Sequence, residues 1–254
     1  MSLEGCLFAK KFVMTSHYYE KLPRCFKFSS FQEASFEEGD AVIVIADIDH
    51  LKPLELPMEE LERAKKVTHQ ASRERYLAGR YLLRGILAEH LSIRPCDIPI
   101  AIGTTGKPFL PAEELHFSIS HAERFVAAIF SKQPVGIDLE QERVLDLPAL
   151  AQRFFSPEEV RFLEGAESSP DFFRLWCARE AAIKGDGRGL GQLLAKTRVS
   201  VPWDASSEYL SVHVQSQEWS VLSWMLRGGA HGAAAFLVRP RVIHWCDLRE
   251  WLVC

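Results

Sequence analysis

Apolar positions along the chain recur with two spacings, one of every second residue and one of three to four residues. The first spacing predicts strands and the second predicts helices. In the first part of the chain, alternation predicts strands over 115–121 and 135–140, and short apolar segments predict strands over 41–46, 100–102 and 125–130. Helical structure is predicted over 59–91, with a break near 68–72. Residues 1–40 show neither spacing and are interpreted as an N-terminal extension.

The later part of the chain begins as helix and returns to strands. Ser156 and Glu159 have the spacing of a capping box, which predicts a helix starting at Pro157. A longer helix is expected over about 170–184, with Gly185 as its left-handed stop. Antiparallel strands are expected over 197–201, 209–215, 219–226 and 233–238.

The order strand, helix, strands therefore occurs twice, once on each side of Pro134. This repetition indicates two similar halves that meet in the middle of the chain. The domain organisation expected is an extension over 1–40, a first half over 41–134 and a second half over 135–254.

The strand predicted over 135–140 carries two carboxylates on one face. Asp138 and Glu140 are two residues apart, so their side chains project together, roughly 6–7 Å apart at Cα. Gly136 lies on the same face and leaves room for something to approach. Such a pair suits a hard cation such as Mg²⁺, although acidic pairs on strand edges are commonly just solvated.

The helix predicted over 170–184 aligns Trp176, Glu180 and Lys184 on one face, because the three are spaced four apart. The alternative is a solvated surface Glu–Lys pair. If Glu180 converges with Asp138 and Glu140, the three carboxylates repel one another unless a cation is present, and their convergence implies a metal.

Further polar groups lie just before the acidic strand. Ser118, Ser120 and His121 permit a nucleophilic interpretation, but the chain has no G-x-S-x-G elbow. Anion binding by the hydroxyl and imidazole groups and a purely structural histidine both stay open. Lys107, in a Gly-Lys-Pro turn, and Lys184 are each able to direct a positive charge at a phosphate. A Schiff-base role for Lys184 is opposed by Glu180, which stabilises its charged form.

Charge, cysteine spacing and the lengths of apolar runs argue against several classes of protein. A net charge of −4 and a pI of about 6.2 provide no general attraction to nucleic acid or to anionic membranes, so an anionic ligand needs a local basic cluster. The six cysteines have no C-x-x-C spacing, which argues against a zinc site or a disulfide framework. No apolar run has membrane-spanning length and no signal-like segment begins the chain, so a cytoplasmic protein is expected.

Four segments together resemble a known family. In order and spacing they are similar to motifs of the 4′-phosphopantetheinyl transferases, in the long single-chain form that activates surfactin synthetase, over about residues 40–240. The segments are Gly106–Pro108, Phe117–His121, Val135–Glu140 and Trp176–Lys184. Two positions depart from the usual pattern: Cys177 replaces a common Ser or Thr, and Arg179 replaces a frequent Lys.

The resemblance implies an α+β fold with two pseudo-related halves. Each half is a small antiparallel sheet packed with a long helix, and the active site lies in the cleft between them. The reaction implied is transfer of the phosphopantetheine arm of coenzyme A to a serine of an acyl- or peptidyl-carrier protein, with release of 3′,5′-ADP. A monomer is expected, because both halves lie in one chain.

The resemblance also assigns roles to residues. Asp138, Glu140 and Glu180 would hold Mg²⁺, with Glu180, or a water that it orients, as the general base on the carrier serine. Lys184 would stabilise charge developing near the pyrophosphate. The positions that match the coenzyme A-binding residues of the family are Arg63, Arg75, Lys107, Ser120 and His121.

Two other functions are alternatives for a chain with these residues. A magnesium-dependent hydrolase of coenzyme A or nucleotides would employ the three carboxylates with water as the nucleophile. A non-catalytic module that binds coenzyme A or a carrier protein would have no need of the full set of Asp138, Glu140, Glu180 and Lys184.

Overall fold

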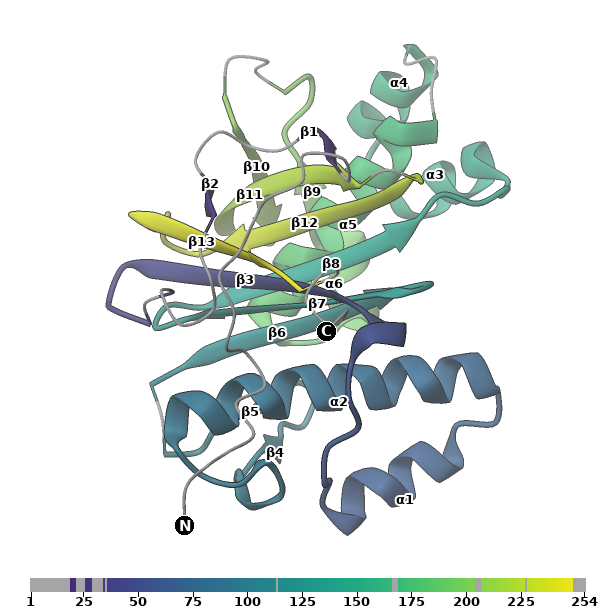
Figure 1. Ribbon diagram of the computed structural model, residues 1–254. Helices are drawn as coiled ribbons and strands as arrows, with labels where there is room; N and C mark the ends of the chain where they lie inside the picture. The colour runs from purple at the N-terminus through teal and green to yellow at the C-terminus, as the bar shows by residue number, and fades with distance from the viewer. Residues whose placement is uncertain are drawn as a thin grey trace.

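The computed structural model of the chain describes residues 19–21, 26–28, 34, 36–112, 114–165, 169–203, 207–226 and 228–248. Its strands are β1 (Tyr19–Lys21), β2 (Phe26–Phe28), β3 (Asp40–Asp47), β4 (Ala101–Ile102), β5 (Pro108–Phe109), β6 (His116–Ala122), β7 (Phe125–Ser131), β8 (Val135–Gln141), β9 (Thr197–Val199), β10 (Tyr209–Val214), β11 (Gln217–Leu226), β12 (Ala230–Phe236) and β13 (Val242–Asp247). Its α-helices are α1 (Met58–Lys66), α2 (Gln70–Leu91), α3 (Leu147–Phe154), α4 (Pro157–Gly165), α5 (Ser169–Asp186) and α6 (Leu190–Leu193). Short 3-10 turns are η3 (Ile48–His50), η4 (Pro95–Asp97) and η5 (Leu194–Lys196). The predicted α+β class is confirmed (Figure 1).

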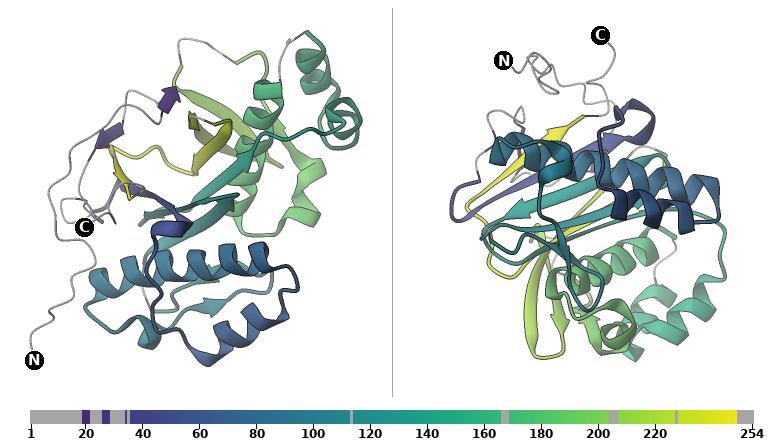
Figure 2. Two further views of the ribbon diagram at one scale, coloured as in Figure 1. Left: turned by 45° about the vertical axis from the view of Figure 1, so that its right-hand side comes forward. Right: turned by 90° about the horizontal axis from the view of Figure 1, so that it is seen from below.

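Two sheets and two long helices form four layers in the order α2, first sheet, second sheet, α5 (Figures 1 and 2). The first sheet has the strand order β2-β13-β3-β7-β6. The second has the order β8-β12-β11-β10-β9, with β1 paired to β11. Each sheet therefore has one long helix on its outer face, as the family resemblance implied.

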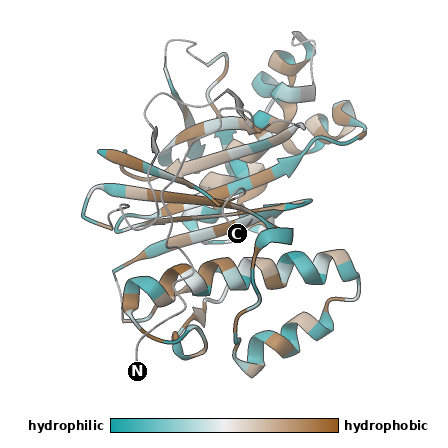
Figure 3. Ribbon diagram, viewed as in Figure 1, coloured by the Kyte–Doolittle hydropathy of each residue, from teal (hydrophilic) through white to brown (hydrophobic). Residues whose placement is uncertain are grey.

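Each sheet lies between two hydrophobic cores, because apolar residues occupy both faces of its strands. One face of β3, including Val42 and Val44, packs with Leu82 and Ile86 of α2. The alternate residues of β3, such as Ile43, pack with the inner face of the second sheet. Figure 3 shows apolar residues concentrated along these central strands and hydrophilic residues along much of α1. Both sheets are thus buried on two faces.

The outer face of the second sheet is covered by α5. Ala178, Ala181 and Ala182 of α5 are fully buried against residues such as Val212 and Ala233. Small alanine side chains on this helix allow it to lie close to the strands, and this closeness matters for the site below.

Local predictions are confirmed at several element boundaries. The break expected near 68–72 separates α1 from α2, which begins at Gln70. The capping box is present, because Glu159 N donates to Ser156 Oγ (3.3 Å) and Ser156 N donates to Glu159 Oε2 (2.6 Å).

The predicted end of α5 was wrong by two residues. The helix continues to Asp186, and Gly187, with φ +82°, is the residue with left-handed backbone after it. Gly185 is needed for packing instead, since a Cβ there would lie 2.6 Å from the Trp219 ring.

The last strand was not predicted. β13 pairs in parallel with β3, Ile243 opposite Ala41, so residues after 240 complete the sheet of the first half. β2 pairs in parallel with β13, and the first sheet is therefore not wholly antiparallel. The division at residues 134 and 135 stays a prediction, and β13 crosses it.

Within the interval expected to be an extension, two short strands pair with the body of the protein. β1 pairs with β11 and β2 pairs with β13. The rest of that interval up to residue 33 lies outside the described residues. Among the helices that are described, none has the length and apolar content that crossing a bilayer requires.

Candidate functional site

The site forms where α5 lies directly on β8. Gly136 makes this possible, because a Cβ at this position would lie 2.0 Å from the carbonyl oxygen of Ala181 and 2.4 Å from the amide nitrogen of Gly185. The space that Gly136 leaves on its strand face is therefore filled by the backbone of α5. As a result, the face of β8 that carries Asp138 and Glu140 meets the face of α5 that carries Glu180 and Lys184.

The rotation of α5 is fixed by a buried ion pair on its other side. Arg179 Nη1 donates to Glu159 Oε2 at 2.7 Å, and Arg179 is 1% exposed. The same guanidinium also donates to the carbonyls of Phe154 and Leu194. Since Arg179 precedes Glu180, locking it inward directs Glu180 toward β8. The Arg179 position noted in the sequence as unusual thus has a structural role.

Three carboxylates converge in the structure, as the family resemblance implied. Ligand oxygens of Asp138, Glu140 and Glu180 all lie within 4.8 Å of one another. Asp138 is 2% exposed, and its Oδ2 is buried without a hydrogen-bond partner among the described residues. A buried carboxylate oxygen with no donor, beside two more carboxylates, fits a hard cation such as Mg²⁺.

In this cluster the three carboxylates outnumber the single cation of Lys184. Burial raises the pKa of Glu180 to about 8, and the charges of Asp138 and Glu140 act in the same direction. Burial also acts to lower the pKa of Lys184, but the carboxylates of Asp138 and Glu180 outweigh it and raise that pKa. A cation bound to the carboxylates would favour the ionised form of Glu180.

Lys184 and Ser120 extend the cluster toward the first half. Lys184 Nζ donates to Asp138 Oδ1 (2.5 Å) and to Ser120 Oγ (2.9 Å). Ser120 Oγ donates to Asp138 Oδ1 (3.0 Å) and accepts from the amide of Leu139 (3.1 Å). Ser118 Oγ likewise accepts from the amide of Ile137. The two serines therefore join β6 to β8, and their engaged hydroxyls disfavour the nucleophilic interpretation.

His121 is exposed at the edge of this region and lines a cavity of about 140 Å³ between α2, β6 and α5. Partial desolvation lowers the pKa of His121, and the positive charges of Lys184 and Arg75 contribute to the same shift. The imidazole is therefore neutral near pH 7 and is able to donate one hydrogen bond to an anion.

Lys107 lines a second cavity, of about 280 Å³, together with the glycine loop after α5. Its Nζ donates to the carbonyl of Gly185 at 2.8 Å, and burial lowers its pKa to about 8. Nearby, Thr105 Oγ1 donates to the carbonyl of Gly187 at 2.5 Å. The Gly-Lys-Pro turn of the first half is thus attached to the second half at the C-terminal end of α5.

Two predicted residues lie apart from both cavities. Arg63 is exposed on α1, and Arg75 donates to Ser72 Oγ at 3.3 Å without lining either cavity. Their assignment to coenzyme A stays a prediction.

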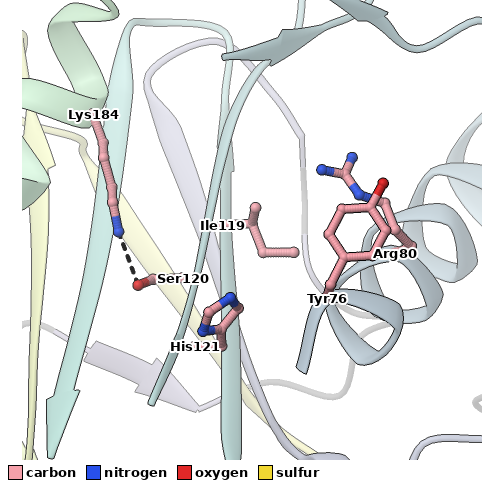
Figure 4. Close-up of a pocket in the computed structure, with 7 residues that line it drawn as sticks. Tyr76, Arg80, Ile119, Ser120, His121 and Lys184 are labelled. Atoms are coloured by element: carbon pink, nitrogen blue, oxygen red, sulfur yellow. Dashed lines mark hydrogen bonds between the residues drawn. The ribbon is translucent and has the colours of Figure 1, made fainter. Parts of the chain in front are cut away.

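Sequence reasoning missed Tyr76 and Arg80. Both line the smaller cavity, and Arg80 also lines the larger one (Figure 4). The signal available was their spacing of four residues, which places them on one face of the predicted helix with Gly79 beside them.

The Trp176 side chain packs against other aromatic side chains. Its ring stacks on Phe172, with centroids 6.0 Å apart and planes at 12°, and contacts Phe154 edge-on. A hydrogen bond from the Trp176 side chain also acts to lower the pKa of Glu180, against the larger effect of burial. Trp176 therefore packs the helix and also contacts the carboxylate one turn away.

Comparisons with known proteins identify the family models and the relatives that the chain matches. The model of the 4′-phosphopantetheinyl transferase superfamily matches residues 134–237, and the model described as 4′-phosphopantetheinyl transferase, N-terminal, matches residues 51–133. The chain is 34% identical over 136 residues to 4′-phosphopantetheinyl transferase Sfp of Bacillus subtilis, covering 52% of this chain and 60% of that protein. It is 37% identical over 147 residues to 4′-phosphopantetheinyl transferase HetI of Nostoc, covering 54% of this chain and 62% of that protein. These alignments span less than two thirds of the relatives' own length.

Proposed function

The chain belongs to the 4′-phosphopantetheinyl transferase superfamily, and we propose on that basis that it transfers the phosphopantetheine arm of coenzyme A to a serine of a carrier protein. The observation that carries the proposal is the convergence of Asp138, Glu140 and Glu180 beside Lys184, at a cleft bordered by both halves. Phosphoryl transfer depends on positioning and charge stabilisation, and this cluster supplies groups for both.

Asp138, Glu140 and Glu180 are the residues that would hold Mg²⁺. When bound, the ion supplies positive charge that neutralises the pyrophosphate of coenzyme A and polarises the phosphorus–oxygen bond that breaks. The orphaned Oδ2 of Asp138 and the raised pKa of Glu180 support this assignment, because both reflect buried carboxylates that outnumber the single cation of Lys184.

Glu180 is also the proposed proton acceptor. The serine oxygen of the carrier forms a bond to the phosphorus that bears the pantetheine, and the bond to 3′,5′-ADP breaks. The serine proton passes to Glu180 Oε, directly or through a water that it orients. Lys184, held between Asp138 and Ser120, stabilises negative charge on the phosphoryl oxygens.

Coenzyme A is the proposed substrate of the cleft, with Ser120, His121 and Lys107 among its contacts. Neutral His121 is available as a hydrogen-bond donor. Among the described residues, Lys107 donates to the carbonyls of Val135 and Gly185, so a phosphate would have to compete with the end of α5 for its charge. Arg63 and Arg75 retain their predicted roles as flanking positive charges. A monomer in the cytoplasm stays part of the same proposal.

The test is incubation of the full chain with apo carrier protein, coenzyme A and Mg²⁺, followed by intact-mass analysis of the carrier. The expected product is a carrier heavier by one phosphopantetheine arm, with one equivalent of 3′,5′-ADP released. Cleavage of coenzyme A that leaves the carrier unmodified would instead establish the hydrolase. Binding without cleavage would establish the non-catalytic module.

A control variant makes the assay specific for the cluster. Glu158→Gln removes an exposed carboxylate that pairs only weakly with Arg161 (3.4 Å), and the rate of carrier modification should not change. Omission of Mg²⁺ with a chelator should abolish the reaction of both proteins. A rate unaffected by the chelator would contradict the metal assignment.

A further inference from the structure

The Lys107 side chain reaches from the first half of the chain to the joint between β8 and α5. Its Nζ donates to the carbonyl of Gly185, in the last turn of α5, at 2.8 Å. It also donates to the carbonyl of Val135, the first residue of β8, at 3.5 Å. Val135 directly precedes Gly136, where the backbones of β8 and α5 touch. One ammonium therefore binds both elements at the point where they cross.

The ammonium of Lys107 is used as a helix cap. The last carbonyls of a helix have no intrahelical partner and carry partial negative charge, and Gly185 O is one of them. The charge of Asp186 acts to raise the pKa of Lys107, against the larger effect of burial. The Asp186 carboxylate, however, accepts Arg188 through both oxygens, from Nε at 2.6 Å and from Nη2 at 2.8 Å. Within the described part of the chain, the hydrogen-bond partners of the ammonium are thus two backbone carbonyls.

The turn that carries Lys107 is packed on the glycine loop after α5. Thr105 Oγ1 donates to the carbonyl of Gly187 at 2.5 Å, which is a second attachment to the end of the helix. A Cβ at Gly187 would lie 3.2 Å from Cδ of Lys107, and a Cβ at Gly189 would lie 3.6 Å from Cβ of Thr105. The glycine loop therefore receives the turn closely, and the Lys107 stem is fixed along its length.

The joint lies close to the reacting groups in the sequence of both elements. Lys184 directly precedes Gly185, and Glu180 lies one turn earlier on α5. Asp138 lies three residues after Val135 on β8. Any shift of the end of α5 relative to β8 would separate Lys184 from Asp138, which it contacts at 2.5 Å, and would displace Glu180 from the other carboxylates. Misplacement of reacting groups by about 1 Å is able to lower a rate about a hundredfold.

We propose that Lys107 is a positioning residue for the carboxylate cluster. Its ammonium fixes the C-terminal end of α5 on β8 and so holds Glu180 and Lys184 in register with Asp138. This inference rests on the proposed function. It assigns the charge of Lys107 to the protein itself, and coenzyme A in the larger cavity contacts the rest of the residue and its turn. A salt bridge from the ammonium to a phosphate is the alternative that the test separates.

Lys107→Met tests the proposal, because it removes the ammonium and keeps an apolar stem. The rate of carrier modification is measured in a single turnover at saturating coenzyme A, and coenzyme A affinity is measured by calorimetry. The rate should fall about tenfold to a hundredfold, and the affinity should stay within about twofold of wild type. Lys107→Arg, which retains a charged donor, should recover part of the rate. Thr105→Val, which removes the second attachment, should lower the rate about twofold to tenfold.

Arg73→Met is the matched control. Arg73 is also a cation that donates to a backbone carbonyl, that of Val67, but it lines neither cavity. Its removal should leave the rate and the affinity at their wild-type values. Weaker coenzyme A binding by Lys107→Met with an unchanged rate at saturation would overturn the proposal, since it would mean that the ammonium contacts a phosphate. A wild-type rate and affinity would overturn it as well.

A measurement without substrate keeps the proposal separable from the proposed function. Hydrogen exchange of the amides of residues 183–187 should be about tenfold faster in Lys107→Met than in wild type, and unchanged in Arg73→Met. Mg²⁺ binding to the protein alone should weaken about tenfold in Lys107→Met, because Glu180 is displaced. Wild-type protein that does not modify a carrier contradicts the transferase. Unchanged exchange and unchanged Mg²⁺ affinity contradict the positioning role, whatever reaction the protein performs. If Lys107→Met fails to fold, Lys107→Arg and Thr105→Val provide the same comparison.

Discussion

The two long helices line opposite walls of the cleft, and the walls have opposite charge. On the α2 wall, Arg80 and Arg84 face the single carboxylate of Glu60. On the α5 wall, three carboxylates face the single cation of Lys184. One wall therefore carries an excess of positive charge and the other an excess of negative charge, although each is built from one helix on one sheet.

The difference in charge determines how each wall is able to receive a phosphate. The α2 wall attracts an anion directly, through donors that are already in place. The α5 wall repels an anion until a cation neutralises its carboxylates. We therefore expect changes on the α5 wall to affect metal binding and catalysis, and changes on the α2 wall to affect the charge that the cleft presents to an anion.

The largest effect is expected for Glu180→Gln. The substitution removes one metal ligand and the proposed base, and the rate of carrier modification should fall by about a thousandfold or more. Because burial disfavours the charged form of Glu180, the variant should remain folded and show no loss of stability in a chelator. Turnover and circular dichroism measure the two properties. A wild-type rate would refute both the base and the metal assignments.

The second prediction compares the stability lost when an arginine is removed from the Arg179–Glu159 pair or from the Arg80–Arg84–Glu60 cluster. Arg179→Met leaves Glu159 buried without its counter-charge and should reduce the free energy of unfolding by about 3–5 kcal/mol. Arg80→Met leaves the Arg84–Glu60 pair intact and should cost less than about 1 kcal/mol. Urea unfolding of both variants measures the difference. Equal losses would show that the positive charge of Arg80 is not in excess.

A pair of glycines tests how closely each helix lies on its sheet. Gly136→Ala brings a Cβ to within 2.0 Å of the backbone of α5 and should cost about 3 kcal/mol or more, with loss of activity. Gly79→Ala on α2 meets side-chain atoms of Ile119 and Val126, the nearest of them Ile119 Cδ1 at 3.2 Å, and should change stability by less than about 1 kcal/mol because alanine also favours the helix. Thermal unfolding of the two variants measures both changes in stability. A mild Gly136→Ala would contradict the backbone contact between α5 and β8.

The last prediction concerns pH in the absence of metal. The pKa of Glu180 is raised from 4.5 to about 8 on folding, so the folded protein holds a proton that the unfolded chain releases. This contribution to stability is complete below pH 4.5 and is lost as the pH rises through 8. With a chelator, wild-type stability should decline across this interval more steeply than that of Glu180→Gln, measured by urea unfolding. Identical slopes would contradict the shift.

Local pattern accounts for much of what the sequence predicted correctly. The capping box at Ser156, the break between α1 and α2 and the alternation in β8 each depend on residues close together in the chain. By contrast, β13 pairs with β3, which lies about two hundred residues earlier in the chain. The six residues of β13 contain no turn or cap signal that predicts such a partner. A parallel pairing of this kind is invisible to local periodicity.

The sequence by itself determined which side chains share a face: Asp138 with Glu140, and Glu180 with Lys184. Only the tertiary structure decided that these two faces meet, through the absence of a side chain at Gly136 and the buried Arg179–Glu159 pair. It also decided that Arg80, and not Arg75, lines the cavities. The physical reason is that periodicity fixes a residue relative to its own helix or strand, while contact, burial and charge balance depend on how distant elements pack.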